Sequence, residues 1–150
     1  MTTLQAGDKA PDFTAMNQDG KEISLSDFAG HKLVLFFYPK ASTPGCTAQA
    51  CNLNENLDHL AAQGYKVLGV SADSQKRQTN FRNKYEFQYD LLADEDRAVI
   101  EAFGVWGPKK FMGREFDGIH RTTFLIDENG VIIEVIGKVK TKEHAAQILR

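Results

Sequence analysis

Two cysteines, Cys46 and Cys51, are the residues of this sequence best suited to chemistry. Structural disulfides are rare in reducing compartments, so two cysteines five positions apart suggest a reactive pair or metal ligands. A metal site is disfavoured, because Cys46, Cys51 and His59 lack the close pairing of zinc ligands. The remaining interpretation of either cysteine is a small buried apolar residue. We therefore start from a reactive thiol site without a cofactor.

The turn before Cys46 predicts the start of a helix. Thr43 is a good N-cap residue, and Pro44 suits the first helical position because it has no N–H group to leave unpaired. Cys46 then falls in the first turn, where unpaired backbone N–H groups and the positive end of the helix dipole favour an anion. This position favours the thiolate, which is the nucleophilic form of cysteine.

A buried strand is expected to position this turn. Residues 32–38 are apolar after Lys32 and are followed by Pro39, which is typical of a strand covered on both faces. A helical pattern continues over residues 43–63, and a second buried strand follows at residues 65–70. Strand, helix and strand in this order predict a parallel α/β unit, whose ligand sites lie beyond the carboxyl ends of the strands.

The other predicted elements complete one α/β domain, residues 1–150, with a mixed central sheet and helices on both faces. They are an N-terminal hairpin at residues 13–25, a helix at 75–85, a strand at 89–92, a helix at 96–103, a hairpin at 122–136 and a last helix from a Thr141 cap to Leu149. We expect Lys109 and Lys110 to be solvated and Phe111 to be a packing residue.

Composition argues against several classes of partner. The 18 basic and 20 acidic residues give a net charge of -2, which favours neither nucleic acid nor an anionic membrane. The N-terminal residues lack the apolar core of a secretory signal, and the longest apolar run, residues 33–38, is too short to cross a bilayer. We therefore expect a cytoplasmic protein.

The segment FFYPKASTPGCTAQAC, residues 36–51, resembles the active-site segment of the peroxiredoxins, particularly the bacterioferritin comigratory protein or Q-type subfamily. Similarity extends over essentially the whole chain, including FGVWGP at residues 103–108 and GIHRTTFLID at residues 118–127. The resemblance implies a thioredoxin-like fold with an added N-terminal hairpin. It also implies a thiol-dependent peroxidase acting on hydrogen peroxide and organic hydroperoxides.

The same resemblance implies roles for individual residues. Cys46 would be the peroxidatic cysteine, and the Thr43 hydroxyl would hydrogen-bond to it and to the peroxide. Pro39 would shield the pocket from water, while Arg121 would stabilise the thiolate and the charge that develops on the peroxide oxygens. Donors fixed in advance around this charge lower the barrier to thiolate attack.

Cys51 would resolve the oxidised Cys46 as an intramolecular disulfide, which a thioredoxin- or glutaredoxin-type donor would reduce; the resemblance also allows a monomer. Helix geometry adds a condition, because Cα atoms five residues apart on an intact helix are about 8.6 Å apart. Disulfides require less than about 7 Å. If the pair bonds, the first turns of this helix must unwind.

Two of three alternative functions disagree with the spacing or the surroundings of the cysteines. A thioredoxin-like reductase would carry a Cys-x-x-Cys turn, whereas four residues separate Cys46 from Cys51. The surroundings of Cys46 also lack the glutamine and tryptophan motifs of glutathione peroxidases. The third alternative is a non-catalytic redox sensor or holdase with a Cys46–Cys51 switch, which the sequence leaves open.

Overall fold

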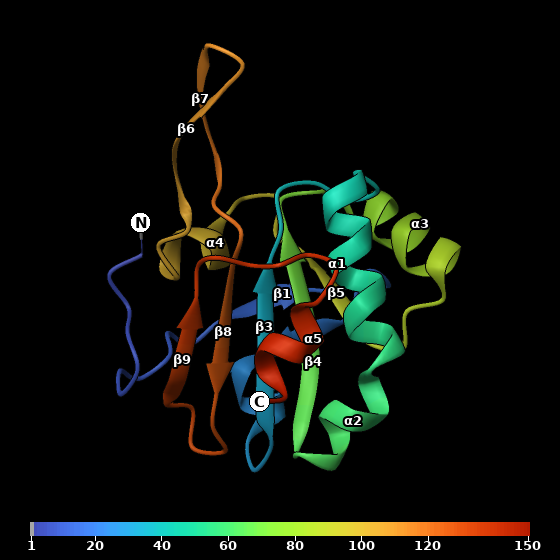
Figure 1. Ribbon diagram of the computed structural model, residues 1–150, viewed down its shortest axis with the longest axis vertical. Helices are drawn as coiled ribbons and strands as arrows, with labels where there is room; N and C mark the ends of the chain where they lie inside the picture. Colours follow the sequence, from blue (N-terminus) through green and yellow to red (C-terminus); the bar gives the residue numbers. More distant parts are fainter. Residues whose placement is uncertain (1) are drawn as a thin grey trace.

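The computed structural model describes residues 2–150, and a five-stranded sheet lies at its centre in the order β5-β4-β3-β8-β9 (Figure 1). Parallel strands form one half of the sheet and antiparallel strands the other. The parallel strands are β3 (Lys32–Phe37), β4 (Tyr65–Ser71) and β5 (Asp90–Ala93), and the antiparallel strands are β8 (Thr122–Ile126) and β9 (Ile132–Ile136). This arrangement confirms the predicted mixed α/β fold.

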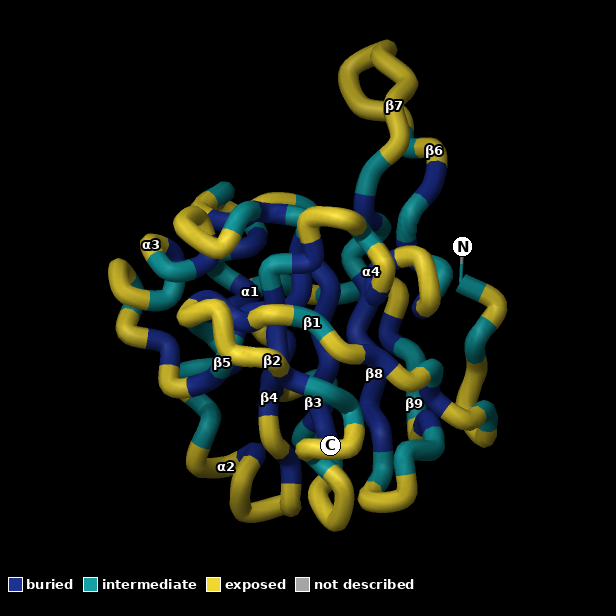
Figure 2. Tube along the Cα trace, turned by 180° about the vertical axis from the view of Figure 1, so that it is seen from behind, coloured by how far each residue is buried: buried dark blue, intermediate teal, exposed yellow. Residues whose placement is uncertain are grey.

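Both faces of the sheet are covered, which explains why β3 is apolar throughout (Figure 2). Alternate β3 side chains enter two separate cores, Val34 and Phe36 on one face and Leu33 and Leu35 on the other. The first face packs against α1 (Pro44–Glu55), α2 (Leu57–Ala62), α3 (Gln75–Tyr85) and α5 (His144–Ile148). The second packs against α4 (Ala98–Ala102), the 3₁₀ helix η1 (Leu25–Phe28) and the N-terminal hairpin.

The N-terminal hairpin is present as predicted, with β1 (Thr14–Met16) antiparallel to β2 (Glu22–Ser24). Its turn is held by the side chain of Asn17, whose Oδ1 accepts the backbone N–H groups of Asp19 and Lys21, each at 2.9 Å. Within residues 2–150, no helix is long and apolar enough to span a membrane.

The helix predicted over residues 43–63 is divided at Asn56 into α1 and α2. Asn56 Nδ2 donates to the Asn52 carbonyl at 2.8 Å, which is the acceptor that the Asn56 backbone N–H would use in a continuous α-helix. That N–H instead bonds to the Leu53 carbonyl at 3.3 Å. The side chain thus competes with the backbone, and the helix ends there.

The last helix is shorter than predicted. Glu143, and not Thr141, is the N-cap residue of α5, and its side chain makes no capping bond. Residues 141–143 form a turn ahead of the helix, in which the Glu143 N–H donates to the Lys140 carbonyl at 3.0 Å. A local turn therefore occupies the predicted first turn of the helix.

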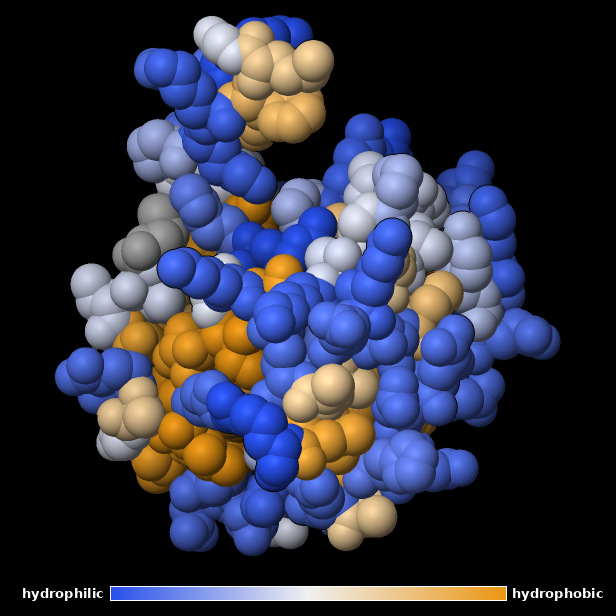
Figure 3. Space-filling model, in the orientation of Figure 1, coloured by the Kyte–Doolittle hydropathy of each residue, from blue (hydrophilic) through white to orange (hydrophobic). Residues whose placement is uncertain are grey.

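A second hairpin, which was not predicted, projects from the body of the molecule (Figures 1 and 3). It consists of β6 (Trp106–Phe111) and β7 (Arg114–Ile119), and within residues 2–150 these strands pair only with each other. Phe111 and Met112 near its tip are 66% and 87% exposed. The expectation that Phe111 is a packing residue is therefore wrong, because the hairpin carries it away from the core.

Candidate active site

Cys46 lies in the first turn of α1, directly beyond the carboxyl end of the central strand β3. Thr43 occupies the N-cap position and Pro44 begins the helix, as predicted. The Cys46 side chain is only 1% exposed and packs with the core that covers this face of the sheet. A cysteine here is close to the N–H groups that an α-helix leaves unpaired at its start, so the backbone favours negative charge on its sulfur.

Arg121 is 75 residues away in sequence but contacts Cys46 directly. Its Nη2 lies 3.3 Å from Cys46 Sγ. Arg121 directly precedes β8, which runs antiparallel to β3, and the first residue of β8 pairs with the last residue of β3, Phe37. The antiparallel pairing therefore brings the guanidinium to the strand end from which α1 begins.

The same guanidinium is held by Gln49, which was not predicted as a site residue. Arg121 Nη1 donates to Gln49 Oε1 at 2.6 Å, and Gln49 is completely buried. Gln49 lies three residues after Cys46, so both side chains project from the same face of α1. The sequence alone does not mark Gln49, because its role depends on burial and on contact with a residue from another part of the chain.

Gly45 leaves room for the Arg121 guanidinium beside the start of α1. A Cβ atom at this position would lie 3.3 Å from Arg121 Nη2, which is tighter than ordinary van der Waals contact. The absence of a side chain therefore allows the guanidinium to approach the helix terminus. Within residues 2–150, Gln49 Nε2 has no hydrogen-bond partner, so one buried amide donor is left over next to Arg121.

The Thr43 hydroxyl does not make the contact expected of it. Its Oγ1 donates to the Lys40 carbonyl at 2.7 Å and caps no N–H group of α1. Thr43 therefore closes the loop between β3 and the helix, and the structure shows no bond from its hydroxyl to Cys46. Pro39 is half-buried at the beginning of the same loop, immediately after the buried Tyr38 that follows β3.

Cys51 lies further along the same unbroken helix, and both cysteines are free thiols. Burial raises the pKa of the Cys51 thiol, and the charge of Glu55 raises it further. Cys51 is therefore held in its protonated form while the helix is intact. Among residues 2–150, no group of three His, Cys, Asp or Glu side chains is placed to hold a metal ion.

Lys109 of β6 is not the solvated charge that we expected. Its Nζ donates to the Ile119 carbonyl at 2.9 Å. Burial lowers the pKa of Lys109, and the nearby Arg121 guanidinium lowers it further, while Cys46 acts in the opposite direction. Lys109, His120 and Arg121 line a surface cavity of about 380 Å³. The base of the second hairpin therefore borders the site, while Lys110 is exposed as predicted.

This sheet, with a thiol at the start of the helix after its central strand, defines a thioredoxin-like thiol redox protein. Comparison with known proteins identifies the particular group. The AhpC/TSA family model matches residues 6–135, and the chain belongs to this family, the peroxiredoxins.

Relatives of known sequence and structure agree with this assignment. The bcp protein of Haemophilus influenzae is 51% identical and peroxiredoxin Bcp of Escherichia coli K12 is 48% identical, each over 99% of this chain and 96% of the relative. A PrxQ variant from Xylella fastidiosa has a TM-score of 0.92 at 33% identity, over 99% of this chain and 95% of that one. The bacterioferritin comigratory protein of Xanthomonas campestris has a TM-score of 0.87 at 37% identity, with the same coverage. The chain is therefore a peroxiredoxin enzyme with a thioredoxin-like fold, and thiol peroxidase activity is its function at this level.

Proposed function

We propose that the enzyme reduces hydroperoxides with Cys46 as its nucleophile and Cys51 as its resolving cysteine. The observation that carries this proposal is the 3.3 Å contact of Arg121 Nη2 with Cys46 Sγ in the first turn of α1. A cationic donor and a helix N-terminus meet at one sulfur, and both favour the thiolate.

In the first step, the thiolate sulfur of Cys46 attacks one oxygen of the hydroperoxide. An S–O bond forms and the O–O bond breaks, so the sulfur is oxidised to sulfenic acid and the other oxygen leaves as hydroxide or alkoxide. This leaving oxygen takes up a proton to become water or an alcohol. Arg121 carries donors that stabilise both the thiolate and the developing charge on oxygen, and it is already held in place by Gln49.

In the second step, the sulfur of Cys51 attacks the sulfenic sulfur of Cys46. An S–S bond forms and water leaves. Both residues lie on the intact α1, so this step requires the first turns of α1 to unwind. Unwinding also exposes Cys51, which removes the burial that raises the pKa of its thiol and frees it to react.

A dithiol protein of the thioredoxin or glutaredoxin type then reduces the disulfide by thiol–disulfide exchange. The Xanthomonas campestris relative was studied for alkyl peroxide reduction, which supports organic hydroperoxides as substrates beside hydrogen peroxide. An intramolecular disulfide needs no second subunit, so we propose a monomer. Cytoplasmic location remains a prediction from the sequence.

A coupled assay tests this cycle. The enzyme is mixed with hydrogen peroxide, thioredoxin, thioredoxin reductase and NADPH, and a parallel series contains glutaredoxin with glutathione. Sustained NADPH oxidation that disappears in Cys46→Ser is the expected result. A single oxidation equal to the amount of enzyme, with no further turnover in either series, would refute the proposed cycle and support a redox sensor.

A further inference from the structure

The loop that joins β3 to α1 contains a strained residue close to the nucleophile. Ser42 has a φ of 66°, in the left-handed region that residues other than glycine, asparagine and aspartate rarely adopt. Such a conformation persists only where the surroundings hold it. Thr43, the N-cap residue of α1, follows directly, so the contacts that hold this loop also place the helix start that carries Cys46.

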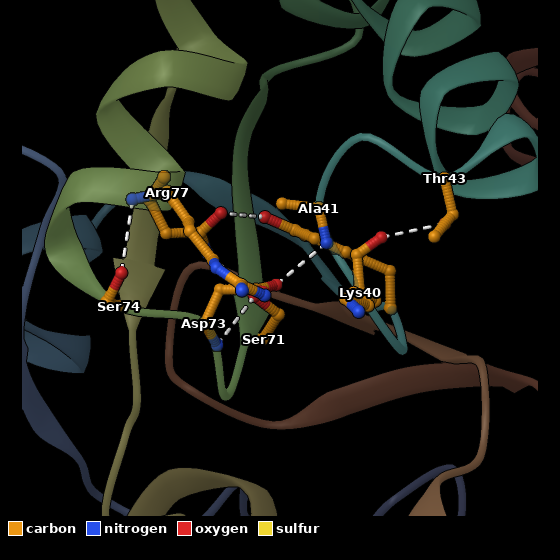
Figure 4. Close-up of polar contacts among 9 residues, drawn as sticks. Lys40, Ala41, Thr43, Ser71, Asp73, Ser74 and Arg77 are labelled. Carbon is orange, nitrogen blue, oxygen red and sulfur yellow. Dashed lines mark hydrogen bonds and ion pairs between the residues drawn. The ribbon is translucent and has the colours of Figure 1, made fainter.

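Asp73 connects this loop to the end of β4 through a hydrogen bond with the Ala41 backbone (Figure 4). Asp73 follows β4 and is 9% exposed. Its Oδ2 accepts the Ala41 backbone N–H at 2.7 Å and the Ser71 hydroxyl at 2.7 Å. Arg77 Nη1 is 3.7 Å from the other carboxylate oxygen, but the arginine side chain is mostly exposed and contributes little. The bond to Ala41 is charge-assisted and lies next to the strained residue.

A buried hydrogen-bond network behind Ser71 supports Asp73. Gln78 of α3 donates from Nε2 to Ser71 Oγ at 2.9 Å and to the Leu92 carbonyl of β5 at 2.8 Å. Its Oε1 accepts the Tyr38 hydroxyl at 2.6 Å. Burial raises the pKa of Tyr38, so this hydroxyl remains a donor. The network is satisfied on every member named here, and such networks hold a single geometry.

We propose that Asp73 is a positioning residue for the peroxidase reaction, because its carboxylate holds Ala41 and thereby sets the loop that aligns Cys46 with Arg121. This inference rests on the proposed role of Cys46 as the nucleophile. Asp73 itself does not touch the sulfur in any contact within residues 2–150. It acts through the backbone of the loop.

Positioning and simple electrostatics predict opposite effects for removal of this carboxylate. Asp73 and Cys46 follow the carboxyl ends of the neighbouring parallel strands β4 and β3, so both lie at the same edge of the sheet. A nearby negative charge disfavours a thiolate, so electrostatics alone predicts that Cys46 reacts faster without Asp73. Positioning predicts that it reacts more slowly.

The test uses Asp73→Ala and Asp73→Asn, with Asp94→Ala as a matched control. Asp94 is also a buried carboxylate at a strand end, but it accepts the N–H groups of Val99 and Ile100 at 3.3 and 2.8 Å, and these residues pack on the opposite face of the sheet from Cys46. The measured quantities are the rate constant for oxidation of Cys46 by hydrogen peroxide, the pH profile of Cys46 alkylation and the urea midpoint.

We expect Asp73→Ala to slow oxidation about tenfold or more, since a charge-assisted bond is lost. Asp73→Asn should restore most of the rate, because an amide oxygen can accept the same N–H group. Asp94→Ala should lower the urea midpoint and leave the oxidation rate unchanged. If Asp73→Ala does not fold, Ser71→Ala removes one support of the carboxylate and should slow oxidation by a smaller factor.

The contrary results distinguish failure of the positioning role of Asp73 from failure of the proposed function. Asp73→Ala that reacts as fast as wild type or faster overturns the positioning role, and so does Asp73→Asn that is as slow as Asp73→Ala. If Asp73→Ala does not fold, an unchanged rate in Ser71→Ala overturns it. A wild-type enzyme in which peroxide leaves Cys46 unoxidised refutes the proposed function and this inference together.

Discussion

Replacement of Arg121 by alanine removes the only side chain in residues 2–150 that donates to the Cys46 sulfur. A hydrogen bond to a charged group contributes about 1.5–3 kcal/mol net, and each 1.4 kcal/mol is about a factor of ten. The rate of peroxide attack should therefore fall by about 10- to 150-fold in Arg121→Ala. The thiolate fraction of Cys46 at neutral pH should fall as well.

The rate of peroxide attack in Arg121→Lys should lie between the rates of wild type and Arg121→Ala. Arginine uses Nη1 for Gln49 and Nη2 for Cys46, at 2.6 and 3.3 Å, and a single ammonium cannot reproduce this fork. Arg114→Ala is the matched control, because Arg114 is exposed on β7. We expect it to leave the rate unchanged.

The assay is rapid mixing of reduced enzyme with hydrogen peroxide in competition with a second peroxidase of known rate. The pH dependence of Cys46 alkylation, followed by mass spectrometry, reports the thiolate fraction separately. Arg121→Ala that matches wild type in both measurements would refute the argument, and Arg121 would then be a surface charge without a role in the reaction.

Two further predictions follow from Cys51 and His144. In Cys51→Ser the first oxidation should keep its wild-type rate, while thioredoxin-coupled turnover falls. Mass spectrometry should show that sulfenic acid accumulates at Cys46 and that overoxidation rises. Normal turnover would show that Cys51 is not the resolving residue. Burial lowers the pKa of His144, which contacts Thr123 and Gln147 and lies near the charge of Arg121. The unfolded chain therefore binds a proton at His144 more readily than the folded protein does. The free energy of unfolding should decrease as pH falls below about 6.5. Urea titrations at several pH values should show this loss in wild type and a smaller loss in His144→Gln; equal losses would exclude His144 as the cause.

Local sequence patterns predicted the parts of the fold that have strong hydrophobic signals. The apolar run at residues 32–38 became the central strand, and the Thr43-Pro44 turn became the start of α1. The break at Asn56 was missed because it depends on a side chain that competes with the backbone hydrogen bonds of the helix. The β6–β7 hairpin was missed because its strands are mostly exposed and show no alternating burial.

The site shows the same division. Cys46 was found from its helix position, and Arg121 only through the family resemblance, because nothing local in the sequence connects residues 75 positions apart. Gln49 and Asp73 were missed, since their roles depend on contacts between elements: Gln49 with the start of β8, and Asp73 with the loop before α1. Polar side chains that act across elements have no periodic signal of their own.

The most direct test of the central claim is the chemical product of equimolar hydrogen peroxide and reduced enzyme, identified by intact mass and peptide mapping without reductant. We expect loss of two hydrogen atoms per chain, a Cys46–Cys51 disulfide within one chain, and faster amide exchange over residues 43–53 as the start of α1 unwinds. No disulfide should form in Cys46→Ser. Oxidation that appears at Cys51 while Cys46 remains a thiol would contradict Cys46 as the nucleophile. A disulfide mainly between chains would contradict Cys51 as the resolving cysteine of the same chain.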